Sequence, residues 1–239
     1  MSVIVNNIKK ELREFTNTDV KKSDKSFFKE KVKTYGVRTP VVRKLANRYF
    51  KKIKHLSKED IFKLSEKLLQ GGYNQEATIA IQWVAKLKDK YSVYDFEIFE
   101  KWLDKYIDNW GKDDDFCLHV IHPMIELYPT WIENVKSWAY SDNMWLRRAS
   151  AVSFITTIGE FYATKHSFKD IFEVADRLLL DKEDLVQKGY GWMLKSASVH
   201  NQKQVFDYVM RHKEKMPRTA LRYAIEKMPP KLKQQAMQK

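Results

Sequence analysis

The chain has 239 residues, of which 44% are hydrophobic and 13% aromatic, so wholesale disorder is excluded and one large domain or two small ones fit. Seven Gly and six Pro are too few for the tight turns of a β-sandwich or barrel, and no GxGxxG or Walker A pattern occurs. The net charge of +13 favours a polyanionic partner, nucleic acid ahead of an anionic membrane. A charge excess that serves solubility or ribosome association is the alternative.

The cysteine content and the N-terminus indicate a reducing compartment. Cys117 is the single cysteine, which excludes an internal disulfide framework and a multi-cysteine zinc site. The N-terminus turns polar after five residues, too early for a signal peptide, and no apolar run approaches the roughly 20 residues that cross a bilayer. We therefore expect a cytoplasmic protein with no cofactor, no metal and no membrane partner.

The elements predicted along the chain are helices. Helices are expected over 58–70, ending at Gly71-Gly72, and over 96–107, 129–139, 169–180, 201–213 and 218–228. Between them, four apolar stripes follow the i, i+3, i+4, i+7 spacing of an amphipathic helix. These stripes are Ala77, Ala80, Ile81 and Val84; Cys117, Val120, Ile121 and Met124; Ala151, Phe154, Ile155 and Ile158; and Tyr190, Met193, Leu194 and Ala197.

The spacing of the stripes predicts the fold. They begin at residues 77, 117, 151 and 190, and a period near 40 with two helices per unit is typical of HEAT or armadillo arrays. We predict an all-α, curved superhelical solenoid of such repeats. Residues 1–239 would form a single domain whose concave face binds the partner.

Trp192 does not belong to the stripe of its own helix. At 100° per residue it lies about 150–160° from the centre of that stripe, so it either packs outside its own repeat or has a functional role. Gly189 and Gly191 flank it, and a glycine inside a helix costs about 1 kcal/mol relative to alanine. Close approach of another backbone, or of a ligand, would account for both glycines.

Three consecutive aspartates, residues 113–115, begin a predicted helix after Trp110. The helix dipole explains one or two carboxylates at this position. The alternative is a carboxylate that faces a cationic reaction centre. Arg148 precedes its stripe by three residues, as Asp114 does, so both are expected on the same inner surface. Arg147 and Arg148 are either solvated charges or phosphate ligands, and periodicity does not choose between them.

For two other candidate sites, a structural role is the favoured explanation. His119, His122 and Glu126 have an i, i+3, i+7 spacing that permits a metal site, but Pro123 bends this helix and packing is favoured. Cys117 lies on an apolar stripe, which indicates a core residue and not a nucleophile.

Four segments together resemble the DNA alkylation repair glycosylases built from HEAT-like repeats, the AlkD family. The similarity runs over roughly residues 5–230, and the order and spacing of the segments carry it. They are Gly-Val-Arg-Thr-Pro at 36–40, Trp-Gly-Lys-Asp-Asp at 110–114, Ser-Asp-Asn-Met-Trp-Leu-Arg-Arg at 141–148 and Gln-Lys-Gly-Tyr-Gly-Trp at 187–192.

The resemblance implies specific roles. Asp114 matches the catalytic aspartate, Trp110 and Trp192 match the two tryptophans, and Arg148 matches the arginine that would anchor a phosphate. Asp113 and Asp115 flank the matched aspartate, so one of these neighbours could take the catalytic role in this chain. The implied activity is excision of cationic N3- or N7-alkylated purines from double-stranded DNA by hydrolysis of the N-glycosidic bond. The lesion would be handled from the backbone side, without a snug base pocket.

Alkylated purines leave readily because they are cationic, so the chemistry needs a carboxylate beside an oxocarbenium-like sugar more than a strong general acid. We expect a monomer that binds DNA through basic residues on the concave face. The rival hypothesis is a helical-repeat scaffold that binds nucleic acid or protein without catalysis; a DNA-binding protein that has lost excision is an intermediate case. The DNA-binding candidates are Arg38, Arg43, Arg147, Arg148, Lys188 and Arg222.

Overall fold

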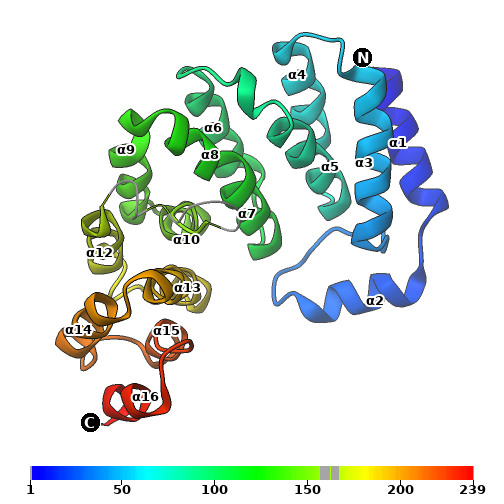
Figure 1. Ribbon diagram of the computed structural model, residues 1–239. Helices are drawn as coiled ribbons and strands as arrows, with labels where there is room; N and C mark the ends of the chain where they lie inside the picture. Colours follow the sequence, from blue (N-terminus) through cyan, green and yellow to red (C-terminus); the bar gives the residue numbers. More distant parts are fainter. Residues whose placement is uncertain (1, 157–161, 163–166, 239) are drawn as a thin grey trace. The chain divides into compact units, whose positions relative to one another are not determined.

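The computed structural model describes residues 2–156, 162 and 167–238 (Figure 1). These residues form helices joined by turns, with one isolated bridge between Lys33 and Tyr73 and no strand among them. The predicted all-α helical-repeat fold is confirmed. Within the described part of the chain, none of the helices has the length and apolar character that crossing a membrane requires. Contacts divide the chain into two compact units, Met1–Met124 and Ile125–Lys239, and the single domain expected over residues 1–239 stays a prediction.

The N-terminal unit consists of helices in two rows. In one row α3, α5 and α7 pack in succession, and in the other α1, α4 and α6 do so, while α4 and α5 form a pair. The indole of Trp83 is fully buried between α3 and α5 and donates a hydrogen bond to the carbonyl of Ala46 at 2.9 Å. The elements are α1 (Ser2–Glu14), α2 (Thr18–Phe27), α3 (Thr39–Ile53), α4 (Lys58–Leu69), α5 (Asn74–Ala85), η1 (Lys88–Lys90), α6 (Asp95–Tyr106), α7 (Trp110–Phe116) and η2 (Cys117–Ile121).

The C-terminal unit repeats this arrangement. Helices α10, α13 and α15 pack in succession, α9 contacts both α10 and α12, and α14 contacts α13 and α16. The helix α8 (His122–Leu127) contains the boundary between the units. The elements of the C-terminal unit are η3 (Pro129–Trp131), α9 (Ile132–Ser137), η4 (Trp138–Tyr140), α10 (Met144–Val152), α12 (Phe168–Arg177), α13 (Asp184–His200), α14 (Gln202–His212), α15 (Arg218–Ala224) and α16 (Pro230–Met237).

The predicted apolar stripes are buried. In the first, second and fourth stripes all four predicted residues are in the core. In the third stripe the prediction of a continuous helix is wrong, because α10 ends at Val152. The amides of Phe154 and Ile155 each donate to the carbonyl three residues earlier, which closes a tight turn and still buries both side chains. Ile158 lies outside the described residues.

Two other predicted helices have different geometry in the structure. The second stripe is a π-helix, Cys117–Ile121, in which the amide of His122 donates to the carbonyl of Cys117. Pro123 has no N–H to donate, so it interrupts the regular α-helical hydrogen bonds. The wider turn of the π-helix lies directly before this interruption. The helix expected over 129–139 is divided into η3, α9 and η4.

Gly189 and Gly191 are explained by close approach, as the sequence predicted. A Cβ on Gly191 would lie 2.7 Å from the Cβ of Tyr223 and 2.9 Å from the carbonyl oxygen of Ala220, both on α15. A Cβ on Gly189 would lie 3.2 Å from Cγ of Arg148 on α10. The two glycines therefore let α13 pack closely against its neighbours in this row.

We expect Gly191→Ala to lower the free energy of unfolding by about 1–3 kcal/mol, because backbone atoms of α15 would have to move. The higher helix propensity of alanine, worth about 1 kcal/mol, offsets part of this loss. Denaturant unfolding measures the effect. Val199→Ala, at a 67% exposed position on the same helix, is the control and should change stability by less than about 0.5 kcal/mol. Equal stabilities of the two variants would contradict the close approach of α15.

Candidate functional site

Asn109 holds the start of α7. Its side-chain oxygen accepts a hydrogen bond from the amide of Lys112 at 3.1 Å, which caps the helix. Its side-chain nitrogen donates to Oδ1 of Asn74 at the start of α5, at 3.0 Å. Lys112 donates to the carbonyl of Gly72 at 2.9 Å and pairs with Asp108 at 2.8 Å. The first turn of α7 is thus tied to the beginning of α5.

Trp110, the first residue of α7, is half-buried in an aromatic cluster. Its ring centroid lies 5.4 Å from that of Phe27 and 5.1 Å from that of Phe28. Phe27 is 67% exposed, so part of the cluster faces solvent. The sequence analysis missed these phenylalanines, although two adjacent aromatics at the end of the basic helix α2 are a recognisable signal.

The three aspartates of α7 have different surroundings, because successive helix positions differ by about 100°. Asp113 is fully buried, whereas Asp114 and Asp115 are half-buried. The carboxylate of Asp115 lies 3.5 Å from Nε2 of His119, one turn later. Asp113 is the acidic residue in the first turn of α7, so the helix-start explanation accounts for one of the three aspartates, and the roles of Asp114 and Asp115 stay predictions.

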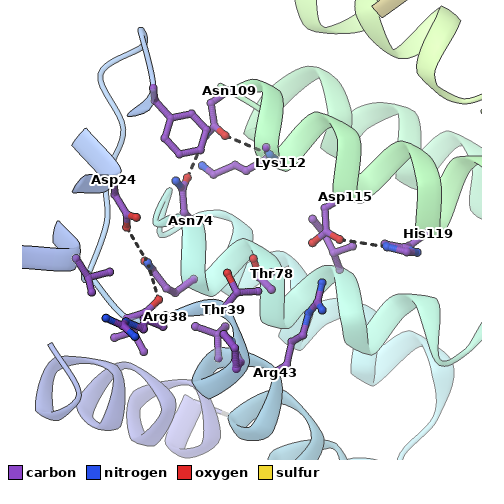
Figure 2. Close-up of a pocket in the computed structure, with 18 of the residues that line it drawn as sticks. Asp24, Arg38, Thr39, Arg43, Asn74, Thr78, Asn109, Lys112, Asp115 and His119 are labelled. Atoms are coloured by element: carbon purple, nitrogen blue, oxygen red, sulfur yellow. Dashed lines mark hydrogen bonds and ion pairs between the residues drawn. The ribbon is translucent and has the colours of Figure 1, made fainter. Parts of the chain in front are cut away.

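Asp115 and His119 line a pocket of about 700 Å³ within the N-terminal unit. Figure 2 shows Arg43 extending from α3 toward Asp115 on α7. Thr39 of α3 and Thr78 of α5 line the same pocket. The wall combines charged, amide and hydroxyl groups with apolar side chains. Its other residues are Val20, Asp24, Phe28, Val37, Arg38, Pro40, Val42, Asn74, Gln75, Ile81, Asn109, Gly111, Lys112 and Leu118.

The electrostatics of the pocket disfavour a bare carboxylate. Desolvation raises the pKa of Asp115 above its ordinary value, and the neighbouring charge of Asp114 raises it further. His119 and Arg43 act in the opposite direction without cancelling the rise. Asp114 and Asp115 are therefore close enough to repel each other, which is the situation in which a nearby cation is stabilising.

The candidate arginines of α3 are available to a ligand. Arg38 is the N-cap residue of α3 and Arg43 lies on its second turn, and both side chains are exposed. Pro40 occupies the first turn, where its missing N–H costs nothing. These two predicted DNA-binding residues lie on the wall of the same pocket.

Arg147 and Arg148 make local contacts in the C-terminal unit. Nε of Arg147 pairs with Asp181 at 2.6 Å, and its Nη1 donates to the carbonyl of Ser141 at 2.9 Å. Arg148 is 4% exposed and donates to the carbonyl of Leu185 on α13. Both side chains thus help to hold α10 in place, and phosphate binding by either stays a prediction.

The remaining candidates lie on α13 and α15. Trp192 is half-buried, away from the buried stripe of its helix. Lys188 pairs with Asp184 at 2.7 Å, one turn earlier, and Arg222 on α15 is exposed. Neither tryptophan of the predicted site is enclosed in the core, and whether both reach one nucleotide stays a prediction.

One acidic cluster could in principle hold a metal. Among the residues that the structure describes, Glu133, Asp170 and Glu173 bring ligand atoms within 4.8 Å of one another. The ammonium of Lys136 lies 2.6 Å from Glu133 and 3.0 Å from Asp170 and also pairs with Glu173, whose pKa it lowers. The ammonium of Lys136 thus already pairs with all three carboxylates, and the cluster is a salt-bridge network between α9 and α12.

Comparison with known proteins identifies a family and a similar fold. The family model described as DNA alkylation repair enzyme matches residues 8–228. A solved structure, "Predicted DNA alkylation repair enzyme from Enterococcus faecalis", is similar with a TM-score of 0.79 at 16% identity, covering 90% of this chain and 97% of that one. No curated protein matches. At this identity the solved structure supports the fold alone.

We expect Asp115→Asn to raise the free energy of unfolding at neutral pH. A raised pKa means that the folded protein binds this proton more tightly than the unfolded chain, so the ionised carboxylate costs stability. The gain should shrink as pH falls toward about 4, where the unfolded carboxyl is itself protonated. Urea unfolding of both proteins between these pH values measures it. A gain that grows on acidification would contradict the raised pKa.

Proposed function

The chain belongs to the DNA alkylation repair enzyme family, and on that premise we propose that it is a DNA glycosylase. The substrate would be a cationic N3- or N7-alkylated purine in double-stranded DNA, and the reaction hydrolysis of its N-glycosidic bond. DNA is the partner that the family suggests, and it fits the net charge of +13. The reaction belongs to base excision repair and is proposed to need no cofactor.

The observation that carries this proposal is the anchored start of α7. The half-buried Trp110 and Asp114 lie four residues apart, about one helical turn, on a helix that Asn109 caps and ties to α5. A carboxylate in such a position stabilises positive charge without first reorganising, which is how preorganised electrostatic groups lower a barrier. The face of Trp110 adds a surface over which a cation is attracted.

The proposed chemistry assigns each group a limited task. As the bond between C1′ and the purine nitrogen breaks, its electron pair stays with the cationic base, which leaves neutral. Asp114 stabilises the oxocarbenium-like sugar and orients the water that attacks C1′, and the water proton passes to Asp114 or to solvent. Trp192 would contact the lesion nucleotide, and Arg148 would support α13 or contact a flanking phosphate.

Asp114→Asn tests the enzymatic role, because it keeps the size of the side chain and removes its charge. We expect the single-turnover rate of 7-methylguanine release from methylated duplex DNA to fall by about 10²–10³. DNA affinity should hold or rise, since one repulsive charge is gone. The exposed Asp89, on η1 of the same unit, provides the control variant Asp89→Asn, whose rate should equal that of the parent.

Two results would contradict the proposal. Release of base by Asp114→Asn at the parental rate would remove the catalytic role of Asp114. A parent protein that binds DNA and releases no base would favour the non-catalytic scaffold, which shares the fold and the charge but has no need of one special carboxylate.

DNA binding should weaken steeply with salt, because cations on the protein displace counterions from phosphates. We expect Arg38→Gln and Arg222→Gln each to lower affinity several-fold and to reduce the slope of log K against log salt by about one. Both side chains are exposed, on the row of α3 and on α15. Fluorescence anisotropy with a labelled duplex measures both quantities. Lys67→Gln, at an exposed position on α4 in the other row of the N-terminal unit, is the control, and an equal loss there would argue against specific DNA contacts by Arg38 and Arg222.

A further inference from the structure

A closed set of hydrogen bonds, the hydrogen-bond ring, joins the start of α5 to the start of α7. The Asn109 side-chain nitrogen donates to Oδ1 of Asn74 at 3.0 Å and to Oδ1 of Asp108 at 2.8 Å. The Lys112 ammonium lies 2.8 Å from the same Asp108 oxygen and donates to the carbonyl of Gly72 at 2.9 Å. Figure 2 shows Asn74, Asn109 and Lys112 side by side at the pocket wall. Two of these contacts therefore cross from α7 to the residues that begin α5.

The hydrogen-bond ring fixes the direction in which the Asn109 amide points. Its nitrogen has an acceptor in Asn74 and another in Asp108, while its oxygen accepts from the amide of Lys112 at 3.1 Å. A reversed amide would bring its oxygen against two other oxygens and its hydrogens against an N–H, and both contacts are repulsive. Asn109 is fully buried, so water does not replace the lost hydrogen bonds. The acceptors around Asn109 thus decide whether this residue caps α7.

The buried ammonium of Lys112 is better explained by orientation than by stability. Its side chain is 3% exposed, and a buried ammonium is tolerated only when it is paired and hydrogen-bonded, as it is here. Replacement of a buried ion pair by apolar side chains of similar volume is often neutral for stability. What an apolar side chain does not supply is a directional tie from α7 to the carbonyl of Gly72.

The start of α5 is itself held, so the hydrogen-bond ring has a fixed base. The backbone N–H of Asn74, the first residue of α5, donates to the carbonyl of Lys33 at 3.0 Å. Gly72 has a φ of 75°, a conformation that side chains other than glycine's rarely adopt, and this turn leads from α4 into α5. The ties from Asn74 and Gly72 to α7 therefore start from backbone that does not move freely.

The helix that the hydrogen-bond ring holds contains the residues of the proposed chemistry. Trp110 is the first residue of α7, and the helix has seven residues, so the placement of its start determines where Asp114 lies. A charged group stabilises a transition state only from the correct position, and a displacement of about 1 Å can cost about 10²-fold in rate. Loss of either tie would therefore be felt at Asp114.

We propose that Asn74 and Lys112 are positioning residues for excision. They act on α7 through Asn109, Asp108 and the carbonyl of Gly72, and they do not contact the reacting atoms. The proposal rests on the proposed function for the reaction and adds two residues that its chemistry did not include. A purely structural role would accept any side chain that keeps the fold, whereas a positioning role requires an acceptor at residue 74 and a donor at residue 112.

The test compares Asn74→Leu with Asn74→Asp in the full chain. Leucine has a similar shape and no acceptor, whereas aspartate keeps an oxygen for Asn109 and suits the first position of α5 because of the helix dipole. We expect Asn74→Leu to lower the single-turnover rate of 7-methylguanine release from duplex DNA about ten-fold at saturating protein, with DNA affinity within about two-fold of the parent. Asn74→Asp should restore the rate to within about three-fold. Asn7→Leu, at an exposed position on α1, is the matched control and should keep the parental rate.

A second measurement needs no excision. The amide of Lys112 donates to Asn109, so its hydrogen exchange reports the cap directly. Exchange should be at least about ten-fold faster in Asn74→Leu and in Lys112→Met, and close to parental in Asn74→Asp. Lys67→Met, at an exposed position on α4, is the control for the lysine variant. If denaturant unfolding shows that Asn74→Leu is not folded, Lys112→Met replaces it in both measurements.

Three results would overturn the proposal. They are a parental excision rate in the folded Asn74→Leu and Lys112→Met variants, an Asn74→Asp rate as low as that of Asn74→Leu, and unchanged exchange of the Lys112 amide. The proposed function fails separately, when the parent protein releases no base. In that case faster exchange in the two variants retains the positioning of α7 by Asn74 and Lys112, and unchanged exchange refutes it.

Discussion

The hydrogen bonds of the buried Asn109 side chain are the constraint on which the candidate site depends. One side-chain group of this residue caps α7 and the other reaches Asn74 at the start of α5. Because a buried amide must satisfy both its donor and its acceptor, this arrangement leaves α7 little freedom to rotate. This orientation of α7 sets the directions of its aspartates. It also sets the contact of Trp110 with Phe27, the last residue of α2, and with Phe28, which follows that helix.

On α7 the adjacent carboxylates of Asp114 and Asp115 have different environments. Asp114 and Asp115 are one residue apart, so they project about 100° apart around the helix. Asp115 enters a pocket that contains Arg43, His119 and apolar side chains, whereas Asp114 lies outside that lining. Neighbouring residues of one helix therefore have different surroundings, and the proposed chemistry uses Asp114 alone.

The basic excess of the chain is not all available to a polyanion. Arg147 is committed to Asp181 and to backbone carbonyls, and Lys136 to three carboxylates, because each of these cations joins neighbouring helices. Exposed residues such as Arg38 and Arg222 have no such structural task in the described part of the chain. The described part of the chain thus uses some cations to join neighbouring helices and leaves others exposed at the surface.

The sequence by itself determined the all-α class, the repeat period and most of the buried residues, because the apolar spacing of a helix is a local property. It also predicted that Gly189 and Gly191 mark close approaches, since a glycine inside a helix requires a compensating contact. It did not predict the π-helix at Cys117, the early end of α10 at Val152 or the pocket at Asp115, since these depend on contacts between helices. The tertiary structure alone decided which arginine side chains are exposed and which neighbours each aspartate contacts. The periodicity of the sequence gives the direction of a side chain on its own helix, but it does not say which residues lie in that direction.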